Sequence, residues 1–355
     1  MSCATEKIHS VVLLSVTDRG LYCEAGDFYV DPWLPVSRAV ITHAHGDHAR
    51  WGCDAYLGAR EGQRVLRTRL GAGATIRLAD YGEPIDLNGV HVSLHPAGHI
   101  LGSAQVRIEH QGEVWVVSGD YKTEPDATCT PYESLRCHTF ITESTFGLPI
   151  YRWSPEATVL DEIMRWWRAN AESGRTSVMF AYALGKAQRV LSGLRDVSVG
   201  PIYTHGAIER LNRDYRDSGV ALADTIYASA LPRGHDFSNG LVLAPPSAGG
   251  SLWLRRFGAI STAFASGWMR IRGARRRRTL DRGFALSDHA DWPSLLEAIA
   301  ATGAERVWVT HGYREPVVRW LLEHGVQAES VMSHWEGEGE TELQDLAVAG
   351  EEIVA

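Results

Sequence analysis

The sequence predicts an α/β fold in which one domain is interrupted by a second. Short β-rich segments separated by Gly, Pro and Asp make up most of the first 120 residues. After Pro149, strand-like and helix-like segments alternate with short links, and the earlier style returns near the C-terminus. These observations indicate two layered α/β units, the first of which is split by the second.

The first unit is predicted from β-rich segments that follow one another at short intervals. A brief apolar run near the N-terminus is expected to be a first strand and not a signal peptide, because no small-residue cleavage site follows it. A helix is expected over residues 60–71, where REGQRVLRTRLG replaces the strand pattern. The expected strands of this unit cover residues 10–16, 28–32, 39–45, 90–99, 104–110 and 113–121.

The second unit begins with a helix that we expect from about Glu156 to Gly174, a suitable C-cap residue. A buried strand over 176–184 and a helix over 185–196 follow, and residues 201–219 repeat this strand-then-helix pattern. Such repetition is typical of a parallel sheet, here within a unit of about 120 residues. We therefore expect residues 1–150 and 276–355 to form the first domain and 151–275 to be inserted into it.

Composition limits the class of protein. The chain has 355 residues, 45% hydrophobic and 22% charged, which is enough for two packed domains. No stretch approaches the roughly 18 consecutive apolar residues of a membrane helix, so we expect a soluble protein without a membrane partner. Five cysteines without CxxC spacing fit the reducing cytoplasm better than a disulfide framework.

Charge is distributed unevenly along the chain. The net charge of −8 by itself argues against a nucleic-acid partner. The segment from Arg255 to Arg282, however, contains nine arginines and only one acidic residue, Asp281. A local basic strip of this kind is what phosphate binding needs, although a solvated charged loop is an alternative for residues 275–278. The candidates for nucleic-acid contacts are Ser144, Thr145, Lys186, Arg270, Arg272, Arg275 and Arg276.

The strongest signal for chemistry is the segment ITHAHGDHARWG. It places His43, His45, Asp47 and His48 within six residues, directly after an apolar strand. Burying several imidazoles and a carboxylate together is costly unless something compensates their polarity. Strand alternation puts His43 and His45 on one side of the backbone, and a turn at Gly46 brings Asp47 and His48 to a neighbouring point. The segment can therefore serve two adjacent metal ions.

Three further candidate ligands stand at the ends of β-rich segments. His99, Asp120 and His311 are each flanked by Gly, so each can project from a strand end into one shared edge. Together with the His segment they supply the nitrogen and oxygen ligands that suit two divalent ions, zinc or manganese. Asp31, which follows another strand, is expected to orient a ligand imidazole.

The HxHxDH segment, a later His and an Asp after an apolar strand resemble the metallo-β-lactamase superfamily over the interrupted domain. The resemblance implies an αββα sandwich with two metal ions at one edge. It implies that the first metal is held by His43, His45 and His99, the second by Asp47, His48 and His311, and that Asp120 bridges them.

Other motifs indicate a branch of this superfamily. Glu143 in FITESTFG precedes the inserted unit, and His289 in SDHAD follows it. This order resembles the β-CASP nucleases, whose inserted α/β domain closes over the metal site. The resemblance implies that Glu143 orients His289, which bonds the scissile phosphate or protonates the leaving oxygen. The catalytic candidates are Asp47, Asp120, Glu143 and His289.

A closer resemblance covers nearly the whole chain. HPAGHILGSAQVRIEH, SGDYKTEPD, TESTFGLP, AYALGKAQRV, FASGWMRIR and SDHADWPSL are similar to the bacterial ligase-associated DNA exonucleases. This implies a two-metal DNA exonuclease of DNA repair, with an ATP-dependent DNA ligase and a helicase as partners. An RNA-processing β-CASP nuclease stays open, because members that act on RNA typically carry a His where this chain has His311. A thioester or amide hydrolase and an inactive scaffold are further alternatives.

Overall fold

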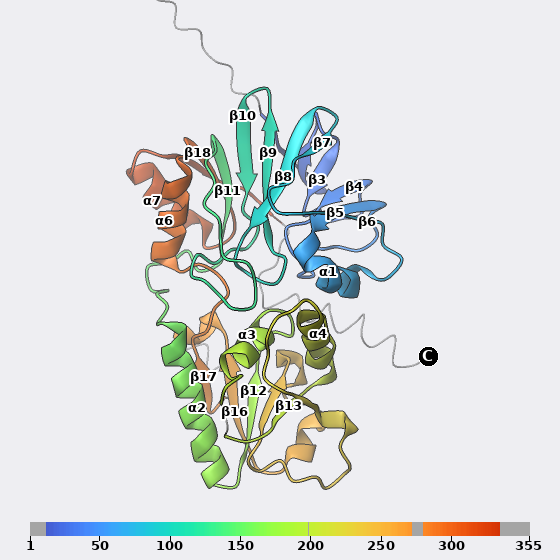
Figure 1. The fold of residues 1–355 in the computed structure, drawn as a ribbon. Coiled ribbons are helices and arrows are strands. Elements are labelled where there is room, and N and C mark those ends of the chain that lie inside the picture. The colour runs from blue at the N-terminus through green and yellow to red at the C-terminus, as the bar shows by residue number, and fades with distance from the viewer. Residues whose placement is uncertain (1–11, 198, 272–279, 334–355) are drawn as a thin grey trace, which may run out of the picture.

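The computed structural model describes residues 12–197, 199–271 and 280–333 of the chain. Figure 1 shows two bodies, one above the other. The upper contains two sheets and is called here the two-sheet body; the lower is called the one-sheet body. The α/β class predicted from the sequence is confirmed. Arg272, Arg275 and Arg276 lie outside the described residues.

The first sheet carries the His segment on the loop after its fourth strand. Its strands follow chain order, antiparallel from β1 to β3 and parallel from β3 to β6. Helix α1 (Gln63–Leu70), preceded by the 3-10 turn η1 (Arg60–Gly62), lies where a helix is predicted. The strands are β1 (Ser15–Thr17), β2 (Gly20–Cys23), β3 (Phe28–Val30), β4 (Arg38–Val40), β5 (Ala55–Ala59) and β6 (Ile76–Ala79).

Three strands of this sheet differ from the sequence prediction, and one of these, expected over 28–32, ends at Val30. The strand expected over 10–16 starts at Ser15, and residues up to 11 lie outside the described part of the chain. The strand expected over 39–45 ends at Val40. It ends there because the Thr42 N–H donates to the Asp31 carboxylate at 2.8 Å instead of continuing the strand ladder.

The second sheet has the order β19-β18-β11-β10-β9-β8-β7. Strands β7 to β10 are antiparallel, whereas β10, β11, β18 and β19 run parallel. Its members are β7 (Ile85–Leu87), β8 (Val90–Pro96), β9 (Ala104–His110), β10 (Glu113–Val117), β11 (Thr139–Ser144), β18 (Arg306–Gly312) and β19 (Gln327–Ser330).

The two sheets share one hydrophobic core. Val40 and Leu57 of the first sheet belong to the same buried cluster as Val106 and Val117 of the second. A separate cluster joins the second sheet to α6 (Trp292–Thr302) and α7 (Arg314–Glu323). Since the apolar face of each element is removed from water only by its neighbour, this layering holds the loops at one end of both sheets together.

The one-sheet body is built on a parallel sheet, as the strand-then-helix alternation predicts. The order is β14-β13-β15-β12-β16-β17. Its elements are β12 (Thr176–Phe180), β13 (Ile202–Thr204), β14 (Ile226–Tyr227), β15 (Leu241–Ala244), β16 (Ile260–Ala265), β17 (Arg282–Phe284), α2 (Glu156–Glu172), α3 (Lys186–Gly193) and α4 (Gly206–Asp217), with 3-10 turns η2 (Ala228–Ala230), η3 (Pro246–Ala248), η4 (Leu252–Phe257) and η5 (Gly267–Arg270).

Helix α2 shows how local pattern produces this body. Val159, Ile163 and Trp167 recur every four residues, and all three are buried in a cluster with Met179 of β12. This spacing gives the helix one apolar face toward the sheet. Among the described helices, none is long and apolar enough to cross a membrane.

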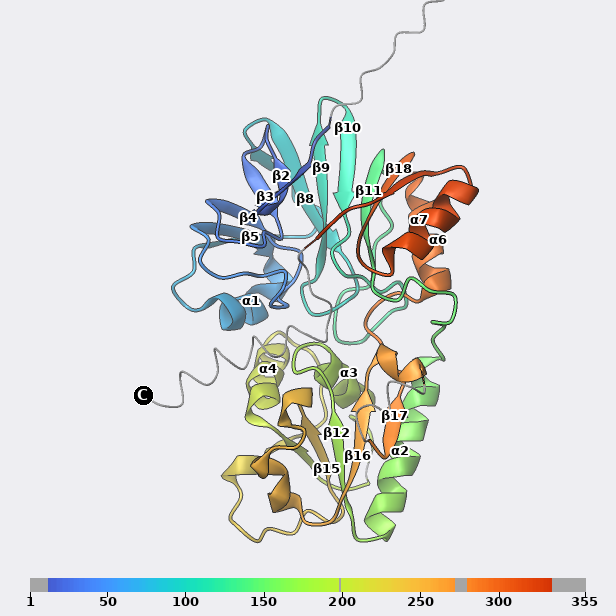
Figure 2. The ribbon, with the colours of Figure 1, turned by 180° about the vertical axis from the view of Figure 1, so that it is seen from behind.

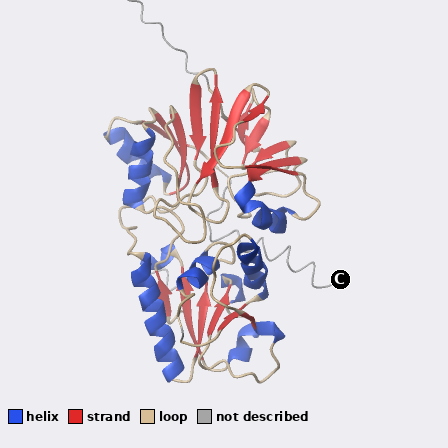
Figure 3. Ribbon diagram, viewed as in Figure 1, coloured by secondary structure: helices blue, strands red, loops and turns tan. Residues whose placement is uncertain are grey.

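The two bodies meet through helices and loops. Thr68 of α1 donates to the Asp214 carboxylate of α4 at 2.6 Å, and the Leu101 N–H donates to the Tyr215 hydroxyl at 3.2 Å. Figure 2, from behind, shows the loops of the two-sheet body facing α3 and α4. Figure 3 shows how much of this junction consists of loops. Irregular backbone there can present side chains that regular elements hold in place.

Candidate metal centre

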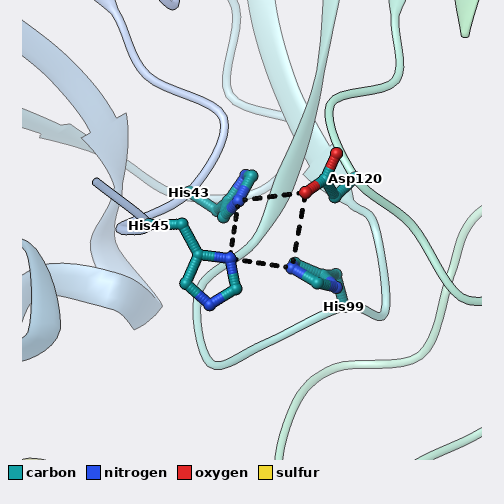
Figure 4. Close-up of side chains that lie close together, drawn as sticks. All are labelled: His43, His45, His99 and Asp120. Atoms are coloured by element: carbon teal, nitrogen blue, oxygen red, sulfur yellow. Dashed lines mark hydrogen bonds and ion pairs between the residues drawn. The ribbon is translucent and has the colours of Figure 1, made fainter. Parts of the chain in front are cut away.

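Four side chains from three separate loops converge at the edge of the two-sheet body (Figure 4). Nδ1 of His45 lies 3.1 Å from Nε2 of His43 and 3.2 Å from Nε2 of His99. Oδ2 of Asp120 completes the group at 3.5 Å from the His43 nitrogen and 3.8 Å from that of His99. The structure thus brings three predicted ligands of one metal to the predicted bridging residue.

A second group shares Asp120. Its Oδ1 lies 2.9 Å from Nε2 of His311, and its Oδ2 lies 3.6 Å from Nε2 of His48. The Asp47 carboxylate approaches the same His48 nitrogen at 3.8 Å. Asp120 therefore faces both groups, one oxygen toward the His segment and one toward His311.

Asp31 fixes the two ends of the His segment. Its carboxylate accepts the Thr42 N–H at 2.8 Å and the Thr42 hydroxyl at 2.5 Å, and it lies 2.7 Å from Nδ1 of His48. The residue is fully buried and has a φ of 43°, a left-handed conformation that few residues other than glycine adopt and that Asp tolerates better than most. Because Nδ1 of His48 is engaged by Asp31, its Nε2 faces Asp47 and Asp120.

Gly119 lets Asp120 reach this position. Its φ is 57°, and a Cβ at this residue would lie 2.7 Å from the Cβ of Thr42. Only glycine combines that backbone conformation with such close approach. At the end of the strand predicted from VWVVSGDY, the chain therefore turns next to Thr42, which places Asp120 beside the His segment.

Burial and charge set the protonation of the imidazoles. Burial, reinforced by neighbouring imidazoles, holds the pKa of His43 and of His99 well below the ordinary value. Burial also opposes a charge on His48, but the Asp120, Asp47 and Asp31 carboxylates outweigh it and raise its pKa to about 10.

The donor set fits metal ions. Neutral His43 and His99 offer nitrogen lone pairs directed toward the same carboxylate, and the ligand atoms of each group lie within 4.8 Å of one another. The carboxylates around His48 create a negative environment that favours a cation. Histidine nitrogen and carboxylate oxygen are the donors that zinc and comparable divalent ions take.

Beside the metal groups lies a buried carboxylate–imidazole pair. Both oxygens of Glu143 lie 2.9 Å from Nδ1 of His289. The carboxylate also accepts the N–H groups of Tyr121 at 2.8 Å and Thr145 at 3.3 Å. Asp120, Glu143 and His289 form a further group of convergent ligand atoms.

Two backbone carbonyls that sequence reasoning missed also reach the centre, one before α3 of the one-sheet body and one on the loop between β17 and α6. The Leu184 carbonyl lies 3.3 Å from Nε2 of His45, and the Asp288 carbonyl lies 2.9 Å from Nδ1 of His99. The Asp288 side chain joins His99 and His289 in a fourth group of possible ligands. The sequence feature that could have identified Asp288 is its position directly before His289 in SDHAD.

The predicted nucleic-acid contacts are placed differently from one another. Arg270 is exposed at the end of η5. Ser144 and Thr145 are buried, and the Ser144 hydroxyl donates to the His311 carbonyl at 2.6 Å. Lys186, a candidate for gripping backbone phosphates at the mouth between the domains, is fully buried and pairs with Asp288. Its role toward nucleic acid stays a prediction.

Comparison with known proteins adds to this geometry. No family model matches the chain. A probable DNA ligase from Opitutus terrae is 33% identical over 313 residues, covering 87% of this chain and 30% of that protein. Endoribonuclease YSH1 from Eremothecium gossypii is 24% identical over 245 residues, covering 60% of this chain and 31% of its own. Endoribonuclease ysh1 from Schizosaccharomyces pombe is 32% identical over 163 residues, 43% of this chain and 21% of its own.

This chain spans about a third or less of the length of each of these curated relatives. Among solved structures, a protein of unknown function from Enterococcus faecalis V583 shares the fold with a TM-score of 0.57 at 12% identity, covering 84% of this chain and 79% of that one. With the buried His and Asp groups, these likenesses establish that the chain is a relative of the metallo-β-lactamase/β-CASP proteins.

Proposed function

We propose that this chain is a metal-dependent nuclease that hydrolyses the phosphodiester bonds of DNA as an exonuclease in DNA repair. The observation that carries the proposal is the position of Asp120, with one oxygen toward His43, His48 and His99 and the other toward His311. A carboxylate between two imidazole groups suits a pair of divalent ions, zinc or manganese.

The proposal includes the finer architecture. The two sheets with their helices form a metallo-β-lactamase αββα sandwich, of which residues 1–150 and 276–355 are the two parts. Residues 151–275 form the inserted β-CASP domain. The third sheet supports this division, although its last strand, β17, lies after residue 275.

Each predicted ligand has a role in the proposal. The first ion would be held by His43, His45 and His99 and the second by Asp47, His48 and His311, with Asp120 as a shared ligand. Divalent ions at such a site supply Lewis acidity and activate water for attack on an anionic phosphodiester. Asp31 and Thr42 keep the His segment in the geometry that this requires.

His289 and Glu143 perform the proton chemistry. The Glu143 carboxylate accepts a hydrogen bond from Nδ1–H of His289, so that the other ring nitrogen, Nε2, is the atom that acts on the substrate in this proposal. From there His289 bonds the scissile phosphate or gives a proton to the leaving oxygen. The burial of both side chains restricts water at this point.

The relative that matches the largest share of this chain among those reported supports DNA as the substrate. The likeness that extends over 87% of this chain is to a protein named a probable DNA ligase, whereas the endoribonucleases match shorter parts at 60% and 43%. The matched segment is only 30% of that ligase relative. A protein named a DNA ligase thus contains a segment similar to this chain, which supports an ATP-dependent DNA ligase as a partner. A helicase partner rests on family resemblance alone.

One alternative has specific support, and two others meet specific objections. A β-CASP ribonuclease of RNA processing is favoured by the endoribonuclease relatives and by His311 at the centre. A thioester or amide hydrolase gives no reason for the Glu143–His289 pair. An inactive scaffold gives no reason for the convergence of six of the predicted ligands, His43, His45, His48, His99, Asp120 and His311.

The test is cleavage of matched single strands of DNA and RNA, each labelled at one end. Apo protein is first loaded with Zn²⁺ or Mn²⁺. His45→Ala is the control because it removes a predicted ligand of the first metal, whose Nδ1 lies near His43 and His99. The expected result is metal-dependent loss of the DNA strand with the RNA largely intact, in a product ladder that shows the polarity. Preferential cutting of RNA assigns the chain to the processing nucleases, and cleavage of neither strand contradicts the proposal.

A further inference from the structure

Helix α3 of the one-sheet body meets the loop of residues 287–289 through two buried cations. The Lys186 ammonium pairs with the Asp288 carboxylate, and both side chains are fully buried. One turn later, the Arg189 guanidinium donates to the Ser287 carbonyl and pairs with Asp126. A buried cation loses its contacts with water and is stable only where partner groups replace those contacts. The contacts of Lys186 and Arg189 therefore fix the helix relative to the loop.

The loop that these cations hold serves two imidazoles. The Asp288 carbonyl lies 2.9 Å from Nδ1 of His99, and a carbonyl can only accept. The proton of His99 is therefore on Nδ1, which leaves Nε2 directed at His45 and Asp120. The next residue, His289, uses its Nδ1 toward Glu143.

The turn that begins α3 reaches the third imidazole. The Leu184 carbonyl lies 3.3 Å from Nε2 of His45, which places the proton on Nε2 and leaves Nδ1 facing His43 and His99. Gly185 makes this approach possible, because its φ is 86° and a Cβ there would lie 2.4 Å from a methyl carbon of Ile100.

We propose that Lys186, through its ion pair with Asp288, is a positioning residue that sets the orientation of His99 and His289. The inference rests on the proposed function and deepens it. The one-sheet body thus completes the metal centre by fixing which nitrogen of His45 and of His99 faces the metal. Groups that orient metal-bound histidines in this way control both metal affinity and activity.

The competing explanation is that the pair merely stabilises the junction between the bodies. Under that explanation, a folded variant without the pair keeps the metal geometry of the wild type. The proposal instead requires that metal coordination change even where the fold is intact. A spectroscopic readout of coordination, independent of any nucleic acid, therefore separates the two.

The experiment compares Lys186→Met, Lys186→Arg and the double variant Lys186→Met/Asp288→Asn with the full-length wild type. The double variant removes both charges of the pair, so that no unpaired carboxylate is left buried, and it keeps the backbone carbonyl that faces His99. Arg195→Met is the matched control, because Arg195 follows the same helix and its exposed guanidinium pairs only with its neighbour Asp196 among the described contacts.

Each apo protein is titrated with Co²⁺ alone while its visible absorption is recorded, and kcat and KM are measured on the labelled strand. We expect Lys186→Met and the double variant to bind Co²⁺ about 10–100-fold more weakly, with an altered spectrum and a lower kcat at little-changed KM. Lys186→Arg should restore most of the loss, and Arg195→Met should match the wild type.

A folded double variant with the Co²⁺ spectrum, affinity and kcat of the wild type overturns the proposal. If Lys186→Met does not fold, as judged by circular dichroism, the double variant decides the question. If the wild type cleaves no nucleic acid, the proposed function fails, whereas the Co²⁺ titrations still confirm or overturn the positioning role.

Discussion

The Glu143 carboxylate lies 2.9 Å from Nδ1 of His289, although 146 residues separate the two in the chain. The carboxylate cannot turn away easily, because the N–H groups of Tyr121 and Thr145 donate to it as well. Both members of the pair are buried beside Asp120. The imidazole is thereby held in one orientation next to the metal groups.

The first prediction concerns this pair. Glu143→Gln should lower kcat about 10²-fold or more and alter the pH–rate profile, because a neutral amide no longer holds the charge that supports proton transfer by His289. KM and metal content should change little, since neither metal group loses a ligand predicted here. His289→Ala should show the same defect, and a His289→Ala enzyme with normal rate and pH profile would exclude the proton-transfer role.

The second prediction concerns removal of the metals. Chelation should abolish cleavage and lower the thermal midpoint, since an ion present at 100 times its Kd stabilises the folded state by about 2.7 kcal/mol. Asp120→Ala should bind fewer ions and show a smaller midpoint shift on adding metal, because it removes the carboxylate common to both groups. Asp224→Ala, at an exposed position, is the control. Equal metal content in Asp120→Ala and wild type, measured by elemental analysis, would contradict the assignment.

The third prediction concerns acid stability. Burial raises the pKa of Asp126, but Arg189 and the hydrogen bonds from Thr128 outweigh burial and hold it below its ordinary value of 3.8. A carboxyl whose folded pKa is lowered contributes stability above its unfolded pKa and loses it as pH falls toward the folded value. Asp126→Asn should therefore cost about 3 kcal/mol at neutral pH and less below pH of about 4, since it leaves a buried guanidinium without its carboxylate.

Urea unfolding between pH 7 and 3 measures this difference. The matched control is Asp196→Asn, whose carboxylate pairs with Arg195 at an exposed position where solvent screens the interaction. Parallel stability curves for Asp126→Asn and wild type across that pH range would show that the Asp126–Arg189 pair contributes no pH-dependent stability.

The fourth prediction concerns the arginine run, which lies outside the described residues. If Arg275 and Arg276 contact DNA phosphates, replacing both with Gln should reduce the slope of log affinity against log salt by roughly 0.7 per lost contact with a single strand. Arg319→Gln, an exposed arginine of α7 paired with Glu323, should leave the slope unchanged. A slope equal to that of the wild type in the double variant would place the run away from the bound strand.

Much of the fold could be predicted because its signals are local. The helix expected from Glu156 to Gly174 is observed as Glu156–Glu172, since its apolar period of four residues is present in the sequence itself. The strand expected over 39–45 was too long, because the Asp31 carboxylate, from another part of the chain, takes the Thr42 N–H.

The sequence by itself determined which side chains are suited to hold metal ions. His43, His45 and His48 stand in one short segment, and their residue types and spacing carry that information without any knowledge of the fold. Asp31 could also be expected from the sequence to orient an imidazole, but tertiary structure alone decided which backbone carbonyls face His45 and His99. The Asp288 carbonyl lies next to His99, which is 189 positions away in the sequence, and the Leu184 carbonyl lies next to His45, which is 139 positions away. Every residue has a backbone carbonyl, so only the folding of the chain selects the ones that face the imidazoles.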